Sequence, residues 1–250
     1  MSNGWKADLA LYNDPHALRL LLDARGHAMT IWIKRRELII GGAGALITSI
    51  ARAQTAPPTR LIVTPPQIEG PFYPYDAPAE IDADLVRLGI DEAPALGQVV
   101  HLFGTVRRPS GAGYGNVTVE LWQADSRGKY RHPNDTAPPA RDPKFQGYGR
   151  TTTDAAGAFR FRTIRPPAYV IDPARDDRRA PHFHLAVSTR GVRRLTTQLY
   201  IQGEPLNETD RWLHMVADPA QRGALIRPLE DGNAIERNAK RVEYNIVIIA

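Results

Sequence analysis

Two histidines one residue apart are the residues of this chain best suited to chemistry. They are His182 and His184, in a run of residues 179–187 that reads Arg-Ala-Pro-His-Phe-His-Leu-Ala-Val. Because alternate side chains of a β-strand point to the same face, both imidazoles can bind one metal ion. Phe183 and Leu185 then face the opposite side, toward a core. An H-x-H pair also occurs as two packed or merely polar residues, so the pair alone leaves a metal role open.

Eight short segments, in a fixed order, extend this pattern over nearly all of the chain after residue 60. They are TPPQIEGPFYP (64–74), VELWQA (119–124), GKYRH (128–132), GYGRT (147–151), FRTI (161–164), RAPHFH (179–184), TQLY (197–200) and GEPLN (203–207). So many segments in one order are not expected by chance. The chain therefore resembles the intradiol ring-cleavage dioxygenases, a family of non-haem iron(III) enzymes.

The resemblance implies a ferric ion, Fe(3+), held by Tyr130, Tyr169, His182 and His184. A metal ligand binds deprotonated, and a trivalent ion can remove the phenol proton, whose ordinary pKa is about 10. Hard oxygen anions favour the ferric state, unlike the two-His, one-carboxylate set of ferrous oxygenases, which activates dioxygen at the metal. The implied reaction activates the organic substrate instead. It cleaves the bond between two hydroxylated ring carbons, incorporates both atoms of O2 into the product and yields a cis,cis-muconate-type dicarboxylate.

Two catalytic roles follow from the resemblance. Tyr169 matches the tyrosinate that leaves the metal and takes a catechol proton. Arg179 matches an arginine that lies over the substrate, where a fixed positive charge stabilises developing negative charge. Because Arg179 follows Asp176, Asp177 and Arg178, its alternative role is a surface salt bridge.

Four further residues are expected to bind the substrate: Gln198, Gly70, Pro71 and Ile171. Gln198 matches a pocket residue, although a strand glutamine is commonly a polar outward face. Gly70 and Pro71 are expected to shape the far side of the substrate. Ile171 stands where protocatechuate enzymes often carry an aromatic residue. Catechol and hydroxyquinol enzymes carry a helical segment ahead of the catalytic core, and residues 54–99 contain no run long or periodic enough to form one. The identity of the catechol therefore stays open.

The strand pattern predicts an all-β protein, with a β-sandwich catalytic core, long loops and few short helices. Gly and Pro clusters separate short runs rich in β-branched and aromatic residues. The candidate strands are 99–106, 117–123, 158–163, 182–188, 195–201 and 242–249, and a short helix is expected near 218–225. Short strands at this spacing favour a sandwich, the architecture that the resemblance also implies.

The N-terminal part predicts export. Residues 29–53 combine a charged segment containing Arg35 and Arg36, a short apolar run and an Ala-x-Ala end, as in a signal peptide. The run is too short for a stable membrane span, and the paired arginines resemble a twin-arginine signal. We therefore expect export to the periplasm, with residues 1–28 an extension ahead of the true start and residues 54–250 the dioxygenase domain. The alternative is an amphipathic or buried helix and a cytoplasmic protein.

Composition excludes several other classes of protein. The chain has no cysteine, which rules out disulfides, thiolate metal sites and cysteine nucleophiles. Its formal net charge of +5 is spread over arginines interleaved with acidic residues, so nucleic acid is not an expected partner. The expected partners are a small aromatic diol and O2. A homo-oligomer is compatible with the sequence.

Two other functions remain open at this point. A non-catalytic, transthyretin-like β-sandwich that binds a ligand or a protein explains the strands, but it gives no reason for the ordered tyrosines and histidines. Another metalloenzyme, such as a zinc hydrolase or a copper enzyme, could use the H-x-H pair. Zinc typically takes nitrogen, sulfur or carboxylate ligands, so two tyrosinates would be unusual.

Overall fold

The computed structural model describes residues 60–75, 81–89, 93–136, 138–172 and 177–249. The predicted signal peptide (29–53) and the extension before it (1–28) lie outside these ranges, and both stay predictions. Within the ranges that are described, no helix is long and apolar enough to cross a membrane.

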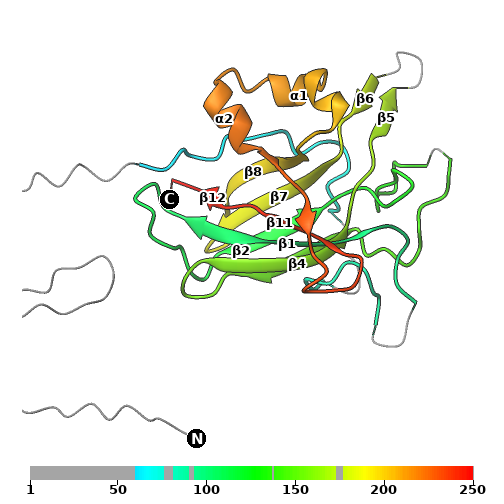
Figure 1. Cartoon of the computed structure of the whole chain (residues 1–250), viewed down its shortest axis with the longest axis horizontal. Coiled ribbons are helices and arrows are strands. Elements are labelled where there is room, and N and C mark those ends of the chain that lie inside the picture. Colours follow the sequence, from blue (N-terminus) through cyan, green and yellow to red (C-terminus); the bar gives the residue numbers. More distant parts are fainter. Residues whose placement is uncertain (1–59, 76–80, 90–92, 137, 173–176, 250) are drawn as a thin grey trace, which may run out of the picture. The chain divides into compact units, whose positions relative to one another are not determined.

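The described chain folds into two five-stranded sheets and a two-stranded hairpin, with short helices at one side (Figure 1). The strands are β1 (Val99–Arg107), β2 (Thr118–Trp122), β3 (Tyr148–Thr152), β4 (Ala158–Ile164), β5 (Tyr169–Asp172), β6 (Asp177–Arg179), β7 (His182–Thr189), β8 (Val192–Ile201), β9 (Ile226–Arg227), β10 (Glu230–Asp231), β11 (Lys240–Glu243) and β12 (Ile246–Val247). The helices are η2 (Pro205–Glu208), α1 (Arg211–His214) and α2 (Pro219–Ala224). The prediction of an all-β sandwich with few short helices is confirmed.

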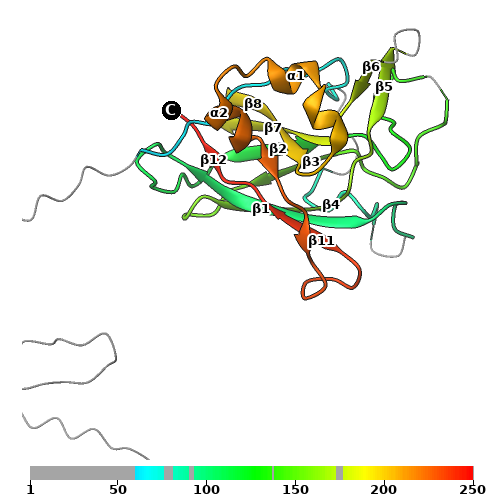
Figure 2. The same ribbon diagram turned by 45° about the horizontal axis from the view of Figure 1, so that its top comes forward.

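The two sheets enclose one apolar core. In the first sheet β1 pairs with β4 on one side and with β11 and β12 on the other, and β10 pairs with β11. The second sheet has the order β3-β2-β7-β8-β9. Buried apolar side chains from both sheets pack together between them, among them Leu102, Leu121, Phe161, Leu185 and Leu199. Helices α1 and α2 lie over the outer side of the second sheet, away from β1 and β4 (Figure 2).

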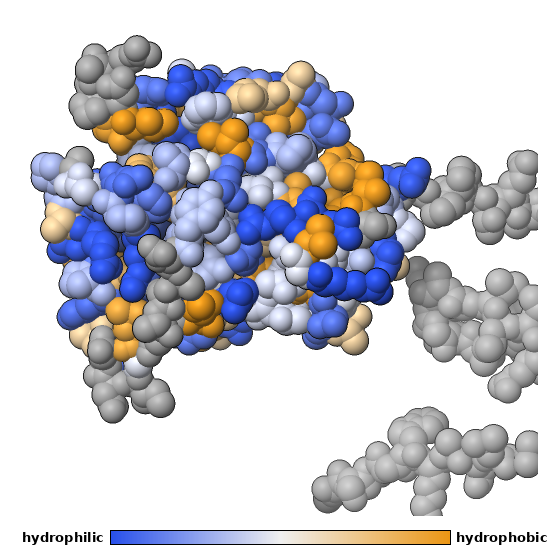
Figure 3. All heavy atoms as spheres, turned by 180° about the vertical axis from the view of Figure 1, so that it is seen from behind, coloured by the Kyte–Doolittle hydropathy of each residue, from blue (hydrophilic) through white to orange (hydrophobic). Residues whose placement is uncertain are grey.

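Strand β7 separates the core from the site by simple alternation. Phe183 and Leu185 point between the sheets and belong to the core. His182 and His184 point to the outer face of the second sheet, where each is only 2% exposed. At this exposure, the two histidines are buried beneath other parts of the chain. On the face seen from behind, Figure 3 shows hydrophobic groups separated by hydrophilic ones.

One predicted strand, 242–249, is wrong as a single element. It forms two short parallel strands, β11 and β12, in the same register on β1. Between them the backbone N of Tyr244 still donates to Phe103, but Thr105 donates to a side chain: Asn245 Oδ1 accepts its backbone N and its hydroxyl at 2.9 and 2.7 Å. Close approach of the backbones requires glycine opposite: a Cβ at Gly104 would lie 1.9 Å from the carbonyl oxygen of Tyr244.

Candidate metal centre

The four residues predicted to bind metal lie together. His182 and His184 come from β7, Tyr169 begins β5, and Tyr130 lies in the loop after β2. The Nε2 atoms of the two histidines are 3.0 Å apart, and Nε2 of His184 lies 3.2 Å from the Tyr130 hydroxyl. The ring centroids of Tyr130 and Tyr169 are 5.4 Å apart, and those of Tyr169 and His182 are 5.6 Å apart. The four rings therefore form a closed cycle around one point.

The two imidazoles fit a bound cation. Nδ1 of His182 donates to the carbonyl oxygen of Ala180 at 2.6 Å, which leaves a lone pair on Nε2, as is usual for a metal-binding histidine. Burial, assisted by the charge of Arg179, lowers the pKa of both histidines well below the usual range, so both rings are neutral, the form that binds metal. Two nitrogens that each lie roughly 2.1 Å from one ion can be no more than about 4.2 Å apart. The Nε2 separation of 3.0 Å is within this limit, so both rings could bind the same ion.

The two phenols complete a donor set for a highly charged ion. Burial raises the pKa of Tyr130 well above the usual range, and the neighbouring Tyr169 raises it further. Burial also raises the pKa of Tyr169, while the charge of Arg179 opposes that rise. Two adjacent phenolates therefore need a strong positive charge, and a trivalent cation supplies it. Among the described residues, no group of three or more His, Cys, Asp or Glu side chains could hold a metal ion.

The loop that carries Tyr130 is fixed by carboxylates and by stacking. Asp135 Oδ2 accepts a hydrogen bond from the backbone N of Tyr130 at 2.7 Å, and Asp135 also pairs with the Lys129 ammonium. Asp125 Oδ1 accepts a hydrogen bond from the backbone N of Lys129 at 3.0 Å. The ring of Phe72 stacks on Tyr130 with a centroid distance of 5.0 Å. Together these contacts aim the Tyr130 hydroxyl at His184.

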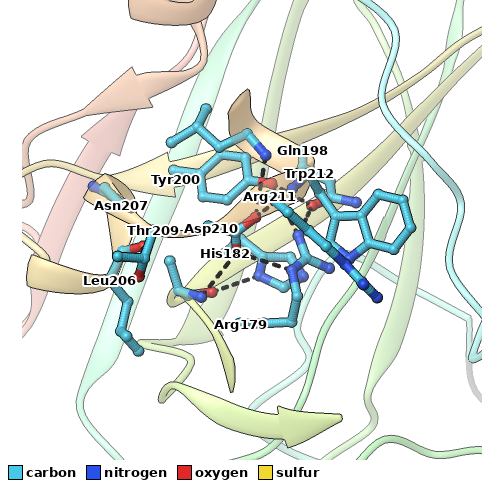
Figure 4. A network of polar contacts seen from close by, with 12 residues as sticks. Arg179, His182, Gln198, Tyr200, Leu206, Asn207, Thr209, Asp210, Arg211 and Trp212 are labelled. Carbon is cyan, nitrogen blue, oxygen red and sulfur yellow. Dashed lines mark hydrogen bonds and ion pairs between the residues drawn. The ribbon is translucent and has the colours of Figure 1, made fainter. Parts of the chain in front are cut away.

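Arg179 lies in a buried network beside this centre (Figure 4). Its Nε donates to Asp210 Oδ2 at 2.9 Å, and its Nη2 donates to Gln198 Oε1 at 2.5 Å and to the Tyr200 hydroxyl at 2.9 Å. Arg179 is 2% exposed, so the alternative of a surface salt bridge is wrong. It is also the direct ladder partner of Tyr169 in the β5–β6 hairpin, which places its charge next to that phenol.

The residues predicted to bind substrate differ in their placement. Gln198 lies opposite His184 on the outer face of the second sheet, where it is fully buried, and its Nε2 donates to the carbonyl oxygen of Ile68 at 2.9 Å. Gly70 lies over His184, because a Cβ built on it would be 3.5 Å from His184 Cε1. Pro71 is exposed next to it, and Ile171 is 40% exposed on β5. Their contacts with a substrate stay predictions.

Three residues of the site were missed from the sequence. Asp210 accepts a hydrogen bond from Arg179. It also caps α1, where its side chain accepts hydrogen bonds from the backbone N of Trp212 and of Leu213. An Asp directly before a short helix is a known N-cap signal and could have pointed to it. Tyr200 binds Arg179 from β8, and Trp122 stacks on His184 from β2. Their partners are distant in sequence, so no local pattern marks them.

Comparison with known proteins agrees with this geometry. A family model described as Dioxygenase matches residues 68–250. The protocatechuate 3,4-dioxygenase beta chain of Burkholderia cepacia is 31% identical over 202 residues, covering 80% of this chain and 86% of that one. Catechol 1,2-dioxygenase 1 of Acinetobacter lwoffii is 32% identical, covering 74% of this chain and 61% of that one. The crystal structure of 3-chlorocatechol 1,2-dioxygenase from Rhodococcus opacus 1CP superimposes with a TM-score of 0.58 at 25% identity, covering 74% of this chain and 72% of that one.

This chain belongs to the intradiol ring-cleavage dioxygenase family. The resemblance drawn from its sequence segments is confirmed, and the protein is an enzyme of the oxidoreductase class. Family membership overturns the alternative of a non-catalytic, transthyretin-like binding protein. It also overturns the alternative of an unrelated metalloenzyme built on the H-x-H pair.

Proposed function

We propose that the protein binds one ferric ion through Tyr130, Tyr169, His182 and His184 and cleaves a catechol-type ring between its two hydroxylated carbons, giving a cis,cis-muconate-type dicarboxylate. The observation that carries the proposal is the position of His184 Nε2, which lies 3.0 Å from His182 Nε2 and 3.2 Å from the Tyr130 hydroxyl. When bound, ferric iron draws electron density from a catecholate and makes a ring carbon reactive toward dioxygen. Relatives named for protocatechuate, catechol and hydroxyquinol support this substrate class.

Tyr169 is the residue suited to accept a proton from the catechol. Burial raises the pKa of its phenol, and the adjacent Arg179 guanidinium limits that rise. The Tyr169 phenolate is therefore a stronger base than a free tyrosinate. Tyr130 differs, because its backbone N is hydrogen-bonded to Asp135 and its ring is stacked on Phe72. We therefore assign the mobile proton to Tyr169 and a fixed ligand role to Tyr130.

Arg179 supplies a preorganised positive charge. Asp210, Gln198 and Tyr200 hold its guanidinium in place before any substrate arrives, so no reorganisation is needed as negative charge develops. Burial alone would lower the pKa of Arg179, but Tyr200, Tyr169 and Asp210 raise it overall, so the charge persists. Gln198 connects this charge to the segment that contains Gly70 and Pro71, through the Ile68 carbonyl. We place the substrate between Gly70 and this network, with Ile171 at its rim.

Metal analysis of the purified protein tests the proposal directly. We expect about one ferric ion per chain and a visible tyrosinate-to-iron charge-transfer band. Catechol, protocatechuate and hydroxyquinol are then offered with labelled dioxygen, and at least one should give a diacid that carries two labelled oxygen atoms. A purified protein that contains zinc or no metal, and that shows no visible band, would rule out the proposed centre. Cleavage beside the diol, which yields a yellow semialdehyde, would rule out the proposed reaction.

We further propose that the enzyme is exported by the twin-arginine route, with cleavage after Ala53 and residues 54–250 as the mature domain. Arg35 and Arg36 ahead of a short apolar run support this reading. Replacing both arginines with lysine should keep the protein in the cytoplasm, as measured by cell fractionation. A native protein whose N-terminal sequence still includes residues 1–28 would contradict both the cleavage site and the start at Met29.

A further inference from the structure

The two histidines of the centre are held in different ways. His182 has the usual arrangement, because its Nδ1 donates to the carbonyl oxygen of Ala180. His184 does not: its Nδ1 is buried and has no hydrogen-bond partner within the described part of the protein. Second hydrogen bonds of this kind orient metal-binding histidines and fix their tautomer. Another contact must therefore hold the ring of His184.

Trp122 is that contact. It is the direct ladder partner of His184 in the β2–β7 pair, and its indole lies almost parallel to the imidazole, with a centroid distance of 4.9 Å and an interplanar angle of 13°. Among the described residues, the indole Nε1 is likewise buried without a hydrogen-bond partner, so Trp122 acts on His184 through its aromatic face. Gly70 approaches the Cε1 and Nε2 edge of the imidazole. His184 therefore lies between an aromatic face and a backbone segment.

A polar cluster fixes Trp122 in turn. Tyr73 packs edge-on against the indole, with a centroid distance of 5.0 Å and an angle of 89°. The Tyr73 hydroxyl donates to Glu120 Oε1 at 3.0 Å, and Arg193 Nη2 donates to Glu120 Oε2 at 2.8 Å. Glu120 lies two residues before Trp122 on the same face of β2. Tyr73 and Gly70 belong to one segment, which therefore presses on both members of the stack.

We propose that Trp122 is a positioning residue that sets the orientation of the His184 ring toward the metal, in place of a hydrogen bond to Nδ1, and that Tyr73, Glu120 and Arg193 hold Trp122 for this purpose. The metal part of this inference rests on the proposed function. The orientation of His184 in the metal-free protein does not depend on it. Mutations in the groups that support metal-binding histidines typically weaken metal binding 10- to 100-fold.

The experiment compares Trp122→Leu with Trp122→Phe, which keeps an aromatic face. Phe161→Leu is the matched control, because Phe161 is a fully buried aromatic residue of the inter-sheet core on β4. Iron retention is measured by competition with a ferric chelator, and His184 is followed in metal-free protein by imidazole ¹H–¹⁵N correlation spectra. We expect Trp122→Leu to bind iron roughly 10- to 100-fold more weakly and to lose the upfield ring-current shift of His184. Trp122→Phe should restore most of both, and Phe161→Leu should alter neither.

Several outcomes would overturn the inference. Unchanged His184 signals in Trp122→Leu would mean that the ring is held by something else, such as solvent at Nδ1. If Phe161→Leu lost as much iron as Trp122→Leu, the iron loss would be explained by general destabilisation of the fold. If Trp122→Leu does not fold, Tyr73→Leu must shift the His184 signals in the same direction, and no shift would refute the proposal. A wild-type protein that binds no iron contradicts the proposed function, whereas the His184 spectra still decide the role of Trp122.

Discussion

The outer faces of the two sheets carry buried histidines near charged residues, one on the first sheet and two on the second, and the two clusters are built differently. On the first sheet, His101 of β1 has partners at both ring nitrogens, with Nε2 3.0 Å from Glu236 Oε2 and Nδ1 2.9 Å from Arg160 Nη2. On the second sheet, Nε2 of His182 and Nε2 of His184 face each other at 3.0 Å. The first cluster is complete as it stands. The second leaves lone pairs directed at one point.

The comparison shows that burial does not distinguish a candidate ligand from a structural histidine. His101 is 3% exposed, and each histidine of the proposed metal centre is 2% exposed. Burial lowers the pKa of all three side chains. What differs is whether the ring nitrogens are satisfied by protein groups, since an unsatisfied buried polar atom is unfavourable unless a ligand pairs with it. Mutations in matched pairs across the two faces can break or sharpen this distinction.

The largest difference is expected between His184→Ala and His101→Ala. His184→Ala removes one of four protein ligands, and we expect loss of iron and of measurable turnover. His101→Ala removes two hydrogen bonds on the other face, and we expect it to lower the free energy of unfolding by about 1–3 kcal/mol while iron content and rate stay unchanged. Metal analysis and thermal unfolding of both variants check this. Full iron content in His184→Ala would show that the ring is merely packed.

The next pair compares two guanidinium networks, the buried one of Arg179 and the partly buried one of Arg162. Arg179→Ala should retain iron but lose roughly 10²- to 10³-fold in kcat, the scale of removing one positioned electrostatic group. It also leaves Asp210, which is 1% exposed, without its cation, so we expect a loss of about 3–5 kcal/mol in stability. Steady-state kinetics and denaturant unfolding measure the two effects.

Arg162→Ala is the matched control for that change. Arg162 donates to Glu236 through Nε and Nη2, both at 2.7 Å, on the face away from the centre. We expect about 1–3 kcal/mol of destabilisation and an unchanged kcat. If kcat in Arg179→Ala equals that of Arg162→Ala, the role of Arg179 is limited to stability.

Local sequence patterns predicted the sandwich, whereas the four ligand candidates came from the family resemblance, and the structure places them side by side. The alternation of side chains in residues 182–188 predicted the strand and its two faces, because a period of two residues depends only on neighbouring positions. The short strands β3, β5, β6, β9 and β10 were not predicted. The β3 sequence, Tyr-Gly-Arg-Thr-Thr, has a glycine and mostly polar residues, and it is a strand because β2 pairs with it. Tertiary pairing overrides weak local preference there.

The supporting residues of the site could not be predicted because their partners are far away in the chain. Asp210 lies 31 residues from Arg179, and Glu120 lies 73 residues from Arg193. Each appears in the sequence as an ordinary acidic residue of a polar stretch. Gln198 illustrates the same limit, since its burial is created by the segment around Ile68, 130 residues earlier.

A smaller effect is expected from two glycines with the same backbone conformation. Gly70 and Gly203 have φ of +78° and +84°, so alanine at either should lower stability by about 1–2 kcal/mol. Of these two glycines, Gly70 has His184 within 4 Å of an added Cβ, whereas Gly203 has no described residue that close. We therefore expect Gly70→Ala to raise KM for the catechol roughly 5-fold by crowding, at the low end of overpacking effects, and Gly203→Ala to leave KM unchanged. Equal KM values in the two variants would place the substrate elsewhere.

The smallest effect concerns the dependence of stability on pH. Burial, followed by the charge of Arg160, lowers the pKa of His101 below its ordinary value of 6.5, while hydrogen bonding to Glu236 and its charge oppose the change, and the charge of Arg162 favours it. The unfolded state therefore takes up a proton more readily, and His101 makes folding less favourable as pH falls below 6.5. Hydrogen bonds from Arg162 lower the pKa of Glu236 below 4.5, so its stabilisation is kept above that pH and lost only below it.

These two windows separate the contributions of His101 and Glu236. His101→Gln cannot titrate, so its unfolding free energy should fall less than that of the wild-type protein between pH 7 and about 5. Loss of its hydrogen bonds should lower stability by about 1 kcal/mol at pH 7, which brings the two curves closer at pH 5. Because His182 and His184 are common to both proteins, their proton uptake cancels in the difference. Urea unfolding at several pH values provides the measurement, and parallel curves would mean that His101 takes up protons equally in the folded and unfolded states.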